Sequence, residues 1–346
     1  MATRLTAKRF VTRVVVLLLV ILSFFIPLPY YVYRPGSAEE LQPILSVEGG
    51  QKDEKGALML TTVLSVPTEN IYYYLYGRVM PHSEIVPKEQ VNRGMSHEEY
   101  SKLLEHMMST SQENSIVAAM RYLNRPVTIN YMGVIVSRVA NYSKAKGILQ
   151  IGDLIERVDN RKISKTEDLL EYLGTKQAGE KVKVELVRDN AKKTEEVELV
   201  TLLDPRGNPV PGRAGLGIEP MTKQKVENLL RVNFKTEDIG GPSAGFMFAL
   251  EIVSQLTPGD LTKGHKIAGT GTINADGNVG QIGGIEHKIV AAHEKGAEIF
   301  FSPADVQPDD TNTKVAKARA EEIGTSMKVV PVRTLREAVE YLKNLP

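Results

Sequence analysis

The sequence predicts a multidomain α+β protein with an amino-terminal transmembrane helix, a β-rich module and a carboxy-terminal α/β domain. Its 346 residues exceed the usual size of one domain, so two or three separate cores are expected. The hydrophobic pattern changes from one long apolar tract to alternating strands, and then to helices mixed with strands. We therefore divide the chain into four parts, which are 1–35, 36–126, 127–203 and 204–346.

Charge and cysteine content exclude several classes of function. Lys and Arg total 43 against 42 Asp and Glu, so the chain has no large basic field and no nucleic-acid partner is expected. Cysteine is absent, which excludes disulfides, thiol nucleophiles and thiolate metal sites. A nucleophile in this chain must therefore be Ser, Thr or a carboxylate.

Residues 1–35 are expected to form a cytoplasmic tail and a membrane anchor. Val14 to Ile26 is nearly unbroken apolar sequence and, with apolar residues that follow, approaches the roughly 20 residues that span a bilayer. Basic residues precede this tract, which places the amino terminus in the cytoplasm. A cleaved signal peptide is the alternative, because small residues follow at 36–38. In both cases the rest of the chain is expected outside the cytoplasm. With a retained anchor, the protein is a single-pass protein of the cell membrane.

The part from 36 to 126 has a mixed pattern and no evident chemistry. Leu58 to Leu64 indicates a strand, and Ser96 with Glu99 has the pattern of a capping box that begins a helix. The histidines and acidic residues here lack ligand spacing on one helical face, so we interpret them as solvated surface and predict no metal site. The residues considered are His82, His97, Glu98 and His106.

The part from 127 to 203 has the alternation of a small β-rich module. Four short runs alternate apolar and polar residues, and an amphipathic helix is expected over Thr166 to Leu173, between the second and third runs. The segment resembles a PDZ domain over about 80 residues. The likeness rests on Tyr131-Met132-Gly133-Val134, Ala145 to Gly147, and Gly152-Asp153-Leu154-Ile155 followed by Asn160.

The PDZ resemblance implies that the module binds peptides. Such domains add an extended peptide to a strand edge beside a helix, with affinity from backbone hydrogen bonds and selectivity from side-chain pockets. By this likeness, the peptide-binding residues are Tyr131, Met132, Gly133 and Val134, at the position of the carboxylate-binding loop. A sandwich-like spacer without a ligand is the alternative.

The clearest signal for chemistry is a glycine-rich turn before an apolar helical run at 246–256. The turn reads Asp238-Ile239-Gly240-Gly241-Pro242-Ser243-Ala244-Gly245. Small neighbours let a substrate backbone approach the serine, and the amino terminus of the helix can stabilise an oxyanion. Ser243 therefore has the surroundings of a nucleophile, although a glycine-rich turn before a helix also fits a simple N-cap.

A second signal lies downstream, where Gly283-Gly284 precedes an expected helix. If Ile285 and Ile289 form its apolar face, Lys288 lies on or beside that face and near the helix amino terminus. Both burial and the helix dipole disfavour an ammonium charge, so this lysine can lose its proton near neutral pH and act as a base. A surface lysine on a capped helix is the alternative.

Together the two motifs resemble the proteolytic domain of the Lon family, over most of residues 205 to 346. The family's Pro-Ser-Ala-Gly signature matches Pro242 to Gly245, and its lysine follows a Gly-Gly-hydrophobe step, as Lys288 does here. The resemblance implies a serine endopeptidase with a Ser243–Lys288 catalytic dyad. It also implies support from Thr270, Gly241, Pro242 and Ala244. Many members have Asp where this chain has Gly240, so the ordering of the active site is not transferred.

The ATPase of Lon has no counterpart in the sequence. No Gly-x-x-x-x-Gly-Lys-Ser/Thr motif occurs, and the nearest stretch, Gly259 to Gly264, continues with His265 and Lys266. We therefore expect no cofactor, and substrates that are exported peptides or flexible, unfolded protein segments. With anchor and PDZ-like module, the chain is most similar to the exported Lon-like PDZ proteases of Gram-positive bacteria, and family likeness permits a homo-oligomer.

Two other functions remain open at this point. Gly241 to Gly245 also fits a nucleophile elbow, so a Ser-His-acid hydrolase is conceivable with His287 or His293 and an acid such as Asp276. The short domain and the polar residues before the serine disfavour it. The second alternative is a PDZ scaffold without activity, which the joint presence of Ser243, Thr270 and Lys288 disfavours.

Overall fold

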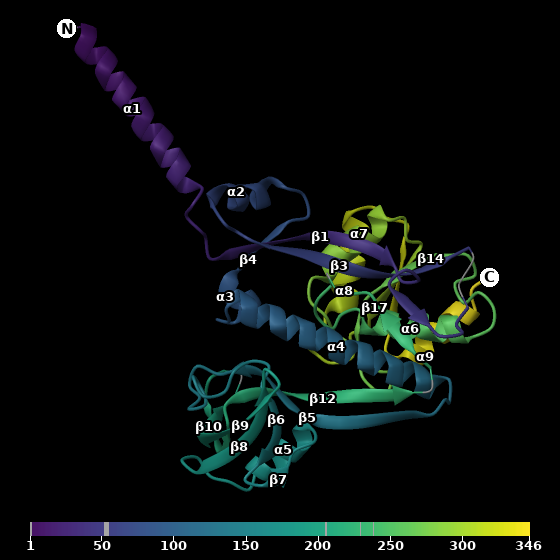
Figure 1. The fold of residues 1–346 in the computed structure, drawn as a ribbon. Helices are drawn as coiled ribbons and strands as arrows, with labels where there is room; N and C mark the ends of the chain where they lie inside the picture. Colours follow the sequence, from purple (N-terminus) through teal and green to yellow (C-terminus); the bar gives the residue numbers. More distant parts are fainter. Residues whose placement is uncertain (1, 52–54, 205, 229, 238) are drawn as a thin grey trace.

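The computed structural model describes residues 2–51, 55–204, 206–228, 230–237 and 239–346 (Figure 1). The helices are α1 (Ala2–Ser23), α2 (Ile71–Val79), α3 (Lys88–Asn92), α4 (His97–Tyr122), α5 (Thr166–Leu173), α6 (Gly245–Leu256), α7 (Ile285–Glu294), α8 (Asn312–Glu322) and α9 (Leu335–Lys343). The amino-terminal strands are β1 (Tyr30–Glu40), β2 (Leu45–Val47), β3 (Ala57–Pro67) and β4 (Glu84–Pro87). The middle strands are β5 (Val127–Val139), β6 (Leu154–Val158), β7 (Arg161–Lys162), β8 (Lys181–Arg188), β9 (Ala191–Glu198), β10 (Val200–Leu203), β11 (Pro209–Gly215) and β12 (Ile218–Asn228). The carboxy-terminal strands are β13 (Val232–Phe234), β14 (Lys266–Gly269), β15 (Thr272–Ile273), β16 (Val279–Gly280), β17 (Ile299–Pro303) and β18 (Lys328–Val332).

The larger part of the structure is built on a mixed sheet whose strands lie in the order β18-β17-β14-β3-β1-β4. The first four strands of this order run parallel, and β1 runs antiparallel to both of its neighbours. Successive side chains of β3 point to opposite faces, so Leu58 and Leu60 pack with α6 whereas Met59 packs with α7. Helices α4, α6 and α9 cover one face, and α7 and α8 cover the other (Figure 1).

The segment from 36 to 126 shares this sheet with the carboxy-terminal part of the chain. Strand β3 pairs in parallel with β14, where Leu60 lies opposite Gly269. The strand expected from Leu58 is present as β3, and the helix expected from the Ser96 capping box begins at His97. The amino-terminal strands therefore complete the sheet on which the candidate site is built.

The β-rich module is a second sheet, in the order β12-β5-β6-β8-β9, with α5 packed against it. Helix α5 has the bounds predicted from the sequence, and its Leu169 and Leu173 join the module's apolar core. Strand β12 pairs with β5 along its whole length, although its residues lie beyond the expected end of the module at 203. The module is therefore completed by a strand that precedes the serine motif.

The predicted carboxylate-binding loop is wrong in its local structure. Tyr131, Met132, Gly133 and Val134 lie within strand β5, not in a loop. Tyr131 is opposite Gln224 and Gly133 is opposite Lys223, so β12 occupies this edge of the strand. The loop position came from the PDZ resemblance, and the resemblance alone does not show which residues of this chain are paired in the sheet.

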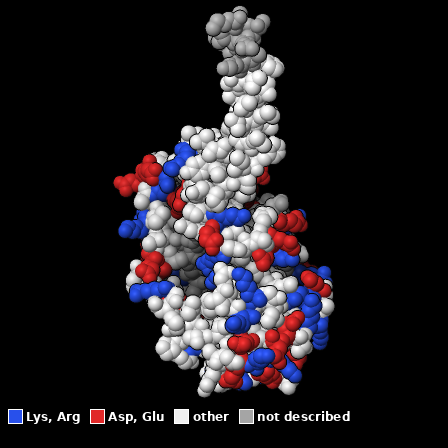
Figure 2. Space-filling model, turned by 90° about the vertical axis from the view of Figure 1, so that its left-hand side faces the viewer, with Lys and Arg blue, Asp and Glu red and all other residues white. Residues whose placement is uncertain are grey.

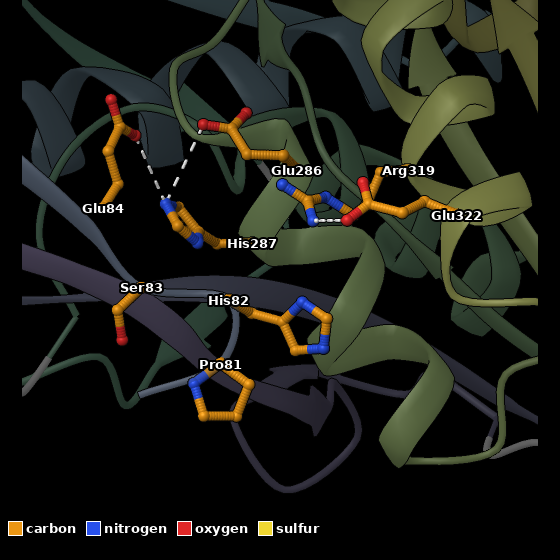
Figure 3. A pocket seen from close by; sticks show the side chains of 8 residues that line it. All are labelled: Pro81, His82, Ser83, Glu84, Glu286, His287, Arg319 and Glu322. Atoms are coloured by element: carbon orange, nitrogen blue, oxygen red, sulfur yellow. Dashed lines mark hydrogen bonds and ion pairs between the residues drawn. The ribbon is translucent and has the colours of Figure 1, made fainter. Parts of the chain in front are cut away.

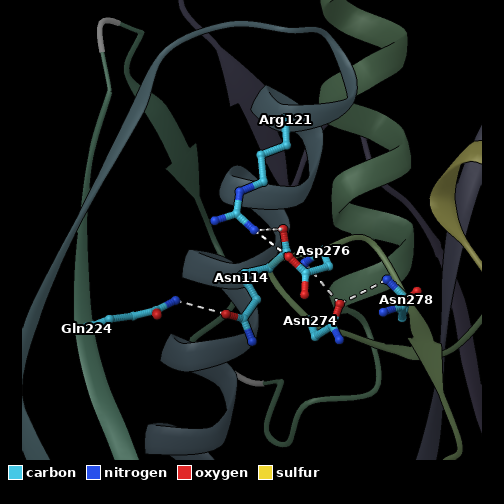
Figure 4. Close-up of polar contacts among 7 residues, drawn as sticks. Asn114, Arg121, Gln224, Asn274, Asp276 and Asn278 are labelled. Carbon is cyan, nitrogen blue, oxygen red and sulfur yellow. Dashed lines mark hydrogen bonds and ion pairs between the residues drawn. The ribbon is translucent and has the colours of Figure 1, made fainter.

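Helix α4 connects the module to the sheet that carries the site. In Figure 4, Gln224 of β12 donates a hydrogen bond to Asn114 of α4 at 2.8 Å. Asn114 donates to the Ile273 carbonyl at 3.1 Å, and Arg121 forms an ion pair with Asp276 at 2.6 Å. The last turns of α4 therefore touch both the module and the loop after β15.

The predicted transmembrane anchor is not supported. Among the described residues, no helix combines the length and the apolar character needed to cross a membrane. Helix α1 ends at Ser23, and the apolar tract continues into strand β1, which begins at Tyr30 and pairs with β3 and β4. The tract is therefore divided between a helix and a strand of the sheet.

Helix α1 projects from the rest of the molecule (Figure 1). Basic and acidic side chains are interspersed over the face of the molecule that Figure 2 shows.

Candidate active site

Ser243 lies in a turn immediately before α6. Gly241 has a φ of +84°, a left-handed conformation that favours glycine. A Cβ on Gly245, the first residue of α6, would overlap the hydroxyl oxygen of Ser111, so glycine permits the close approach of α6 to α4. Ser111 also donates a hydrogen bond to the Pro242 carbonyl at 2.9 Å. These contacts hold the turn that presents the serine.

Lys288 reaches Ser243 from α7, on the opposite face of the sheet. Ile285 and Ile289 of this helix are buried in the core, as the sequence predicts, and Lys288 is only 3% exposed. Its Nζ lies 2.8 Å from Ser243 Oγ, although the two residues are 45 positions apart in the chain. The fold therefore brings the two sequence motifs into contact.

Two further oxygens surround the lysine amine. Thr270 Oγ1 and the Thr61 carbonyl each accept a hydrogen bond from Nζ at 3.0 Å. Thr270 Oγ1 also donates to the Ser243 carbonyl at 3.0 Å, and the Gly271 amide donates to the same carbonyl at 2.9 Å. Thr270 is thus bonded on both sides, and it links the amine to the backbone of the serine.

Burial lowers the pKa of Lys288 from 10.5 to about 7. The physical cause is desolvation, because an ammonium ion in this pocket loses its hydration. Its three hydrogen-bonding partners are two hydroxyls and a carbonyl, none of which carries a negative charge to offset that loss. Much of the amine is therefore neutral near pH 7 and able to take a proton.

A cleft of about 920 Å³ opens onto Ser243 and Lys288. Residues 235–237, 239, 240 and 242–244 line one part of it, and residues 60–65 of β3 line another. The pairing of β3 with β14 ends at Leu60, so residues 62–65 extend along the cleft beyond the last bond to that neighbour. A strand edge of this kind offers backbone groups to an extended peptide.

The residues of the alternative triad do not converge. Asp276 pairs with Arg121 at the end of α4 and its side chain is 72% exposed. His287 faces Glu84 and Glu286, and His293 is exposed near the end of α7. Within the described residues, no histidine bonds to Ser243, whereas Lys288 Nζ is in contact with its hydroxyl. Asp238, the first residue of the serine motif, lies outside the described residues.

Sequence reasoning missed Thr61 and Ser111, which contact the site from β3 and α4. It also missed the groove of the β-rich module. A cavity of about 170 Å³ lies between α5 and the segment from Gly212 to Pro220, lined by Leu170 and Leu173 of the helix and by Leu216 and Ile218. The sequence did contain a signal for this groove, which is the run Gly215-Leu216-Gly217-Ile218. Two glycines there enclose an apolar residue just before a strand, a pattern that is typical of a turn.

Comparison with known families assigns the two parts of this structure. The sequence model described as the Lon protease (S16) C-terminal proteolytic domain matches residues 226–343, which include Ser243, Thr270 and Lys288. The carboxy-terminal part of the chain is a Lon-type proteolytic domain. The model of the PDZ domain matches residues 107–199, which include most of the β-rich module. The resemblances to both families are therefore confirmed at the level of these domains.

Curated relatives of the chain are named Lon protease. That of Aster yellows witches'-broom phytoplasma is 32% identical over 97 residues, which cover 28% of this chain and 11% of that protein. That of Campylobacter concisus is 35% identical over 100 residues, 29% of this chain and 12% of that protein. Lon protease 1 of Bacillus subtilis is 34% identical over 94 residues, 27% of this chain and 12% of that protein. The match to the Lon-type domain thus spans about an eighth of the length of these relatives.

Solved structures similar to this chain include isolated PDZ domains. The PDZ domain of an SdrC-like protein from Listeria monocytogenes is 25% identical and covers 27% of this chain and 92% of that chain, with a TM-score of 0.24. The corresponding domain from Listeria innocua is 31% identical and covers 25% and 92%, with a TM-score of 0.22. These scores are too low to define the fold of the whole chain.

Proposed function

We propose that this chain is an ATP-independent serine endopeptidase in which Ser243 is the nucleophile and Lys288 is its base. The observation that carries the proposal is the 2.8 Å separation of the buried Lys288 Nζ from Ser243 Oγ. The Lon-type domain around both residues supports the same reaction. Gly241, Pro242 and Ala244 form the turn that presents the nucleophile.

The hydrogen bonds around Lys288 can be satisfied by a neutral amine, the form that its lowered pKa favours. A neutral lysine amine has two N–H donors and one lone pair. The Thr61 carbonyl can only accept, and Thr270 Oγ1 uses its own hydrogen on the Ser243 carbonyl, so both accept from Nζ. The lone pair is then directed at the serine hydroxyl, which is the arrangement that a general base requires.

The reaction follows from this arrangement. Lys288 accepts the proton of Ser243 as Oγ forms a bond to the scissile carbonyl carbon. The developing oxyanion is bound by the amides of Ser243 and Ala244, which donate no hydrogen bond within the described part of the chain. Breakage of the C–N bond is accompanied by proton return from Lys288 to the leaving amine. Water, deprotonated by the same lysine, then hydrolyses the acyl-enzyme and regenerates the serine.

The substrates we propose are extended peptides and flexible protein segments. The cleft lies beside the edge of β3, where an extended backbone can pair, and a folded substrate would first have to unfold locally. We further propose that the PDZ domain selects substrates through the groove between α5 and residues 212–220. The basic and then apolar amino terminus favours exported substrates, outside the cytoplasm.

Cleavage of defined substrates tests this proposal. The purified chain is expected to cleave an unstructured protein and an internally quenched peptide at equal rates with and without ATP. Ser243→Ala and Lys288→Ala should each reduce kcat/KM by at least about 1000-fold. The matched controls are Ser326→Ala and Lys295→Ala, which alter exposed residues of the same types. Substantial activity in Lys288→Ala, with its fold intact by circular dichroism, would exclude the dyad.

A further inference from the structure

An imidazole and two carboxylates converge on the first turn of α7, outside the cleft. Glu84 belongs to β4, while Glu286 and His287 are the second and third residues of α7. His287 Nε2 lies 3.6 Å from Glu84 Oε2 and 3.8 Å from Glu286 Oε1. The potential ligand atoms of all three residues lie within 4.8 Å of one another. Figure 3 shows both carboxylates directed toward the same imidazole nitrogen.

His287 supplies an independent reason to expect a ligand here. The residue is 3% exposed, and its Nε2 atom has no hydrogen-bond partner among the described residues. Buried polar atoms in folded proteins are nearly always paired, so an unpaired one that is aimed at two carboxylates requires an explanation. The ring also packs edge-on against Tyr33, with centroids 6.4 Å apart, which fixes its orientation. A cation between the three side chains would provide the missing partner.

We propose that Glu84, Glu286 and His287 bind a divalent transition metal, for which zinc is the best fit. Tetrahedral ligands at about 2.1 Å from zinc lie about 3.4 Å apart. The distances of 3.6 and 3.8 Å from His287 Nε2 are close to this value, and the two glutamates can close the remainder by small side-chain rotations. One imidazole with two carboxylates suits zinc and its first-row neighbours, whereas magnesium and calcium prefer oxygen ligands alone.

The surroundings of the three ligands are compatible with a cation. A cavity of about 640 Å³ adjoins them, and it leaves room for water as a fourth ligand. Arg319 also lines this cavity, but its Nη1 bonds to Glu322 at 2.9 Å, so that guanidinium already has a carboxylate partner. The charges of Glu84 and Glu286 are therefore left to bind the cation. A metal at this position would fasten β4 to the beginning of α7.

Metal binding to the full chain tests the site directly. The protein is purified without a histidine tag, treated with a chelator, and titrated with zinc by calorimetry; cobalt is added separately to record its visible absorption. We expect one equivalent of zinc to bind, and a tetrahedral cobalt spectrum to appear. Zinc at 100 times its Kd should also raise Tm by roughly 5–10 °C. Glu84→Gln and Glu286→Gln should each weaken binding by at least about tenfold.

The control is Glu294→Gln, which removes an exposed carboxylate from the other end of α7 and leaves the ligand set and the Arg319–Glu322 pair intact. It should bind zinc as the wild type does. Glu84 has a side chain that is 55% exposed, so its replacement leaves the fold intact and gives a clear answer even if a His287 variant fails to fold. The proposal is overturned if zinc does not bind saturably, if Glu84→Gln binds it unchanged, or if magnesium binds as tightly as zinc.

Discussion

Thr270 Oγ1 lies 3.0 Å from Lys288 Nζ and accepts its hydrogen bond in a pocket where both side chains are buried. The same hydroxyl donates to the carbonyl of Ser243. Because a threonine hydroxyl has a single hydrogen, this second bond obliges it to act as an acceptor toward the lysine. Thr270 therefore both orients the amine and fixes it relative to the serine backbone.

Replacement of Thr270 by valine should lower kcat/KM by about 10- to 100-fold, because the lysine lone pair is no longer held toward the serine hydroxyl. Thr270→Ser keeps the hydroxyl and should retain most of the activity. Steady-state kinetics on a quenched peptide measures both. A valine variant as active as the serine variant would show that Thr270 has no positioning role.

The activity should rise with pH through a midpoint near 7, the pKa to which burial lowers Lys288. The sign follows from the proposed role, since only the neutral amine accepts a proton and its fraction grows as pH rises. The measurement is kcat/KM between pH 5 and 9, in buffers with a chelator so that metal content stays constant. A flat profile, or one that falls across this range, contradicts a lysine base.

Lys288 should also make folding stability depend on pH. Its folded pKa of about 7 lies below the roughly 10.4 of an unfolded lysine, so between these values the unfolded chain holds a proton that the folded chain lacks. The free energy of unfolding therefore increases with pH over this window. Relative to Lys288→Met, the wild type should gain on the order of 3 kcal/mol between pH 7 and pH 10. Urea unfolding of both proteins at the two pH values measures the gain, and a constant difference between them would refute it.

The groove of the PDZ domain should act on substrate selection and not on chemistry. Leu170 lines this groove and is 48% exposed, so Leu170→Asp changes its apolar surface without disturbing the core. We expect slower cleavage of long substrates, by about tenfold, and unchanged cleavage of a minimal peptide. Glu167→Ala, on the exposed side of the same helix, is the control. Equal losses on both kinds of substrate would mean that the groove has a structural role only.

The two residues proposed to react could be predicted from the sequence, whereas the residues that contact them from β3 and α4 could not. Ser243 and Lys288 were visible because each lies beside glycines that begin a helix, and such local patterns survive in the sequence. Thr61 and Ser111 were not visible, because their contacts depend on how β3 pairs with β14 and on how closely α4 approaches α6. No local pattern encodes these contacts, because they join residues that lie 131 and 227 positions apart in the chain.

Local pattern was least informative where tertiary pairing decides the structure. The apolar tract after Val14 has the composition of a membrane segment, and the residues at its end, from Tyr30 onward, belong to strand β1 of the sheet. The PDZ resemblance placed Tyr131 to Val134 in a loop, whereas these residues lie in β5 and pair with β12. Glu84, Glu286 and His287 were not grouped either, because their convergence requires β4 to lie next to α7.

Reaction of the purified chain with a fluorophosphonate reagent tests the central claim most directly. Mass spectrometry of the digested product should find the adduct on Ser243 alone, formed without ATP and faster at pH 8 than at pH 6. Lys288→Met, which keeps the serine but removes the amine, should be labelled at least about 100-fold more slowly. An unlabelled wild type, an adduct on another residue, or equal labelling of Lys288→Met would contradict the account.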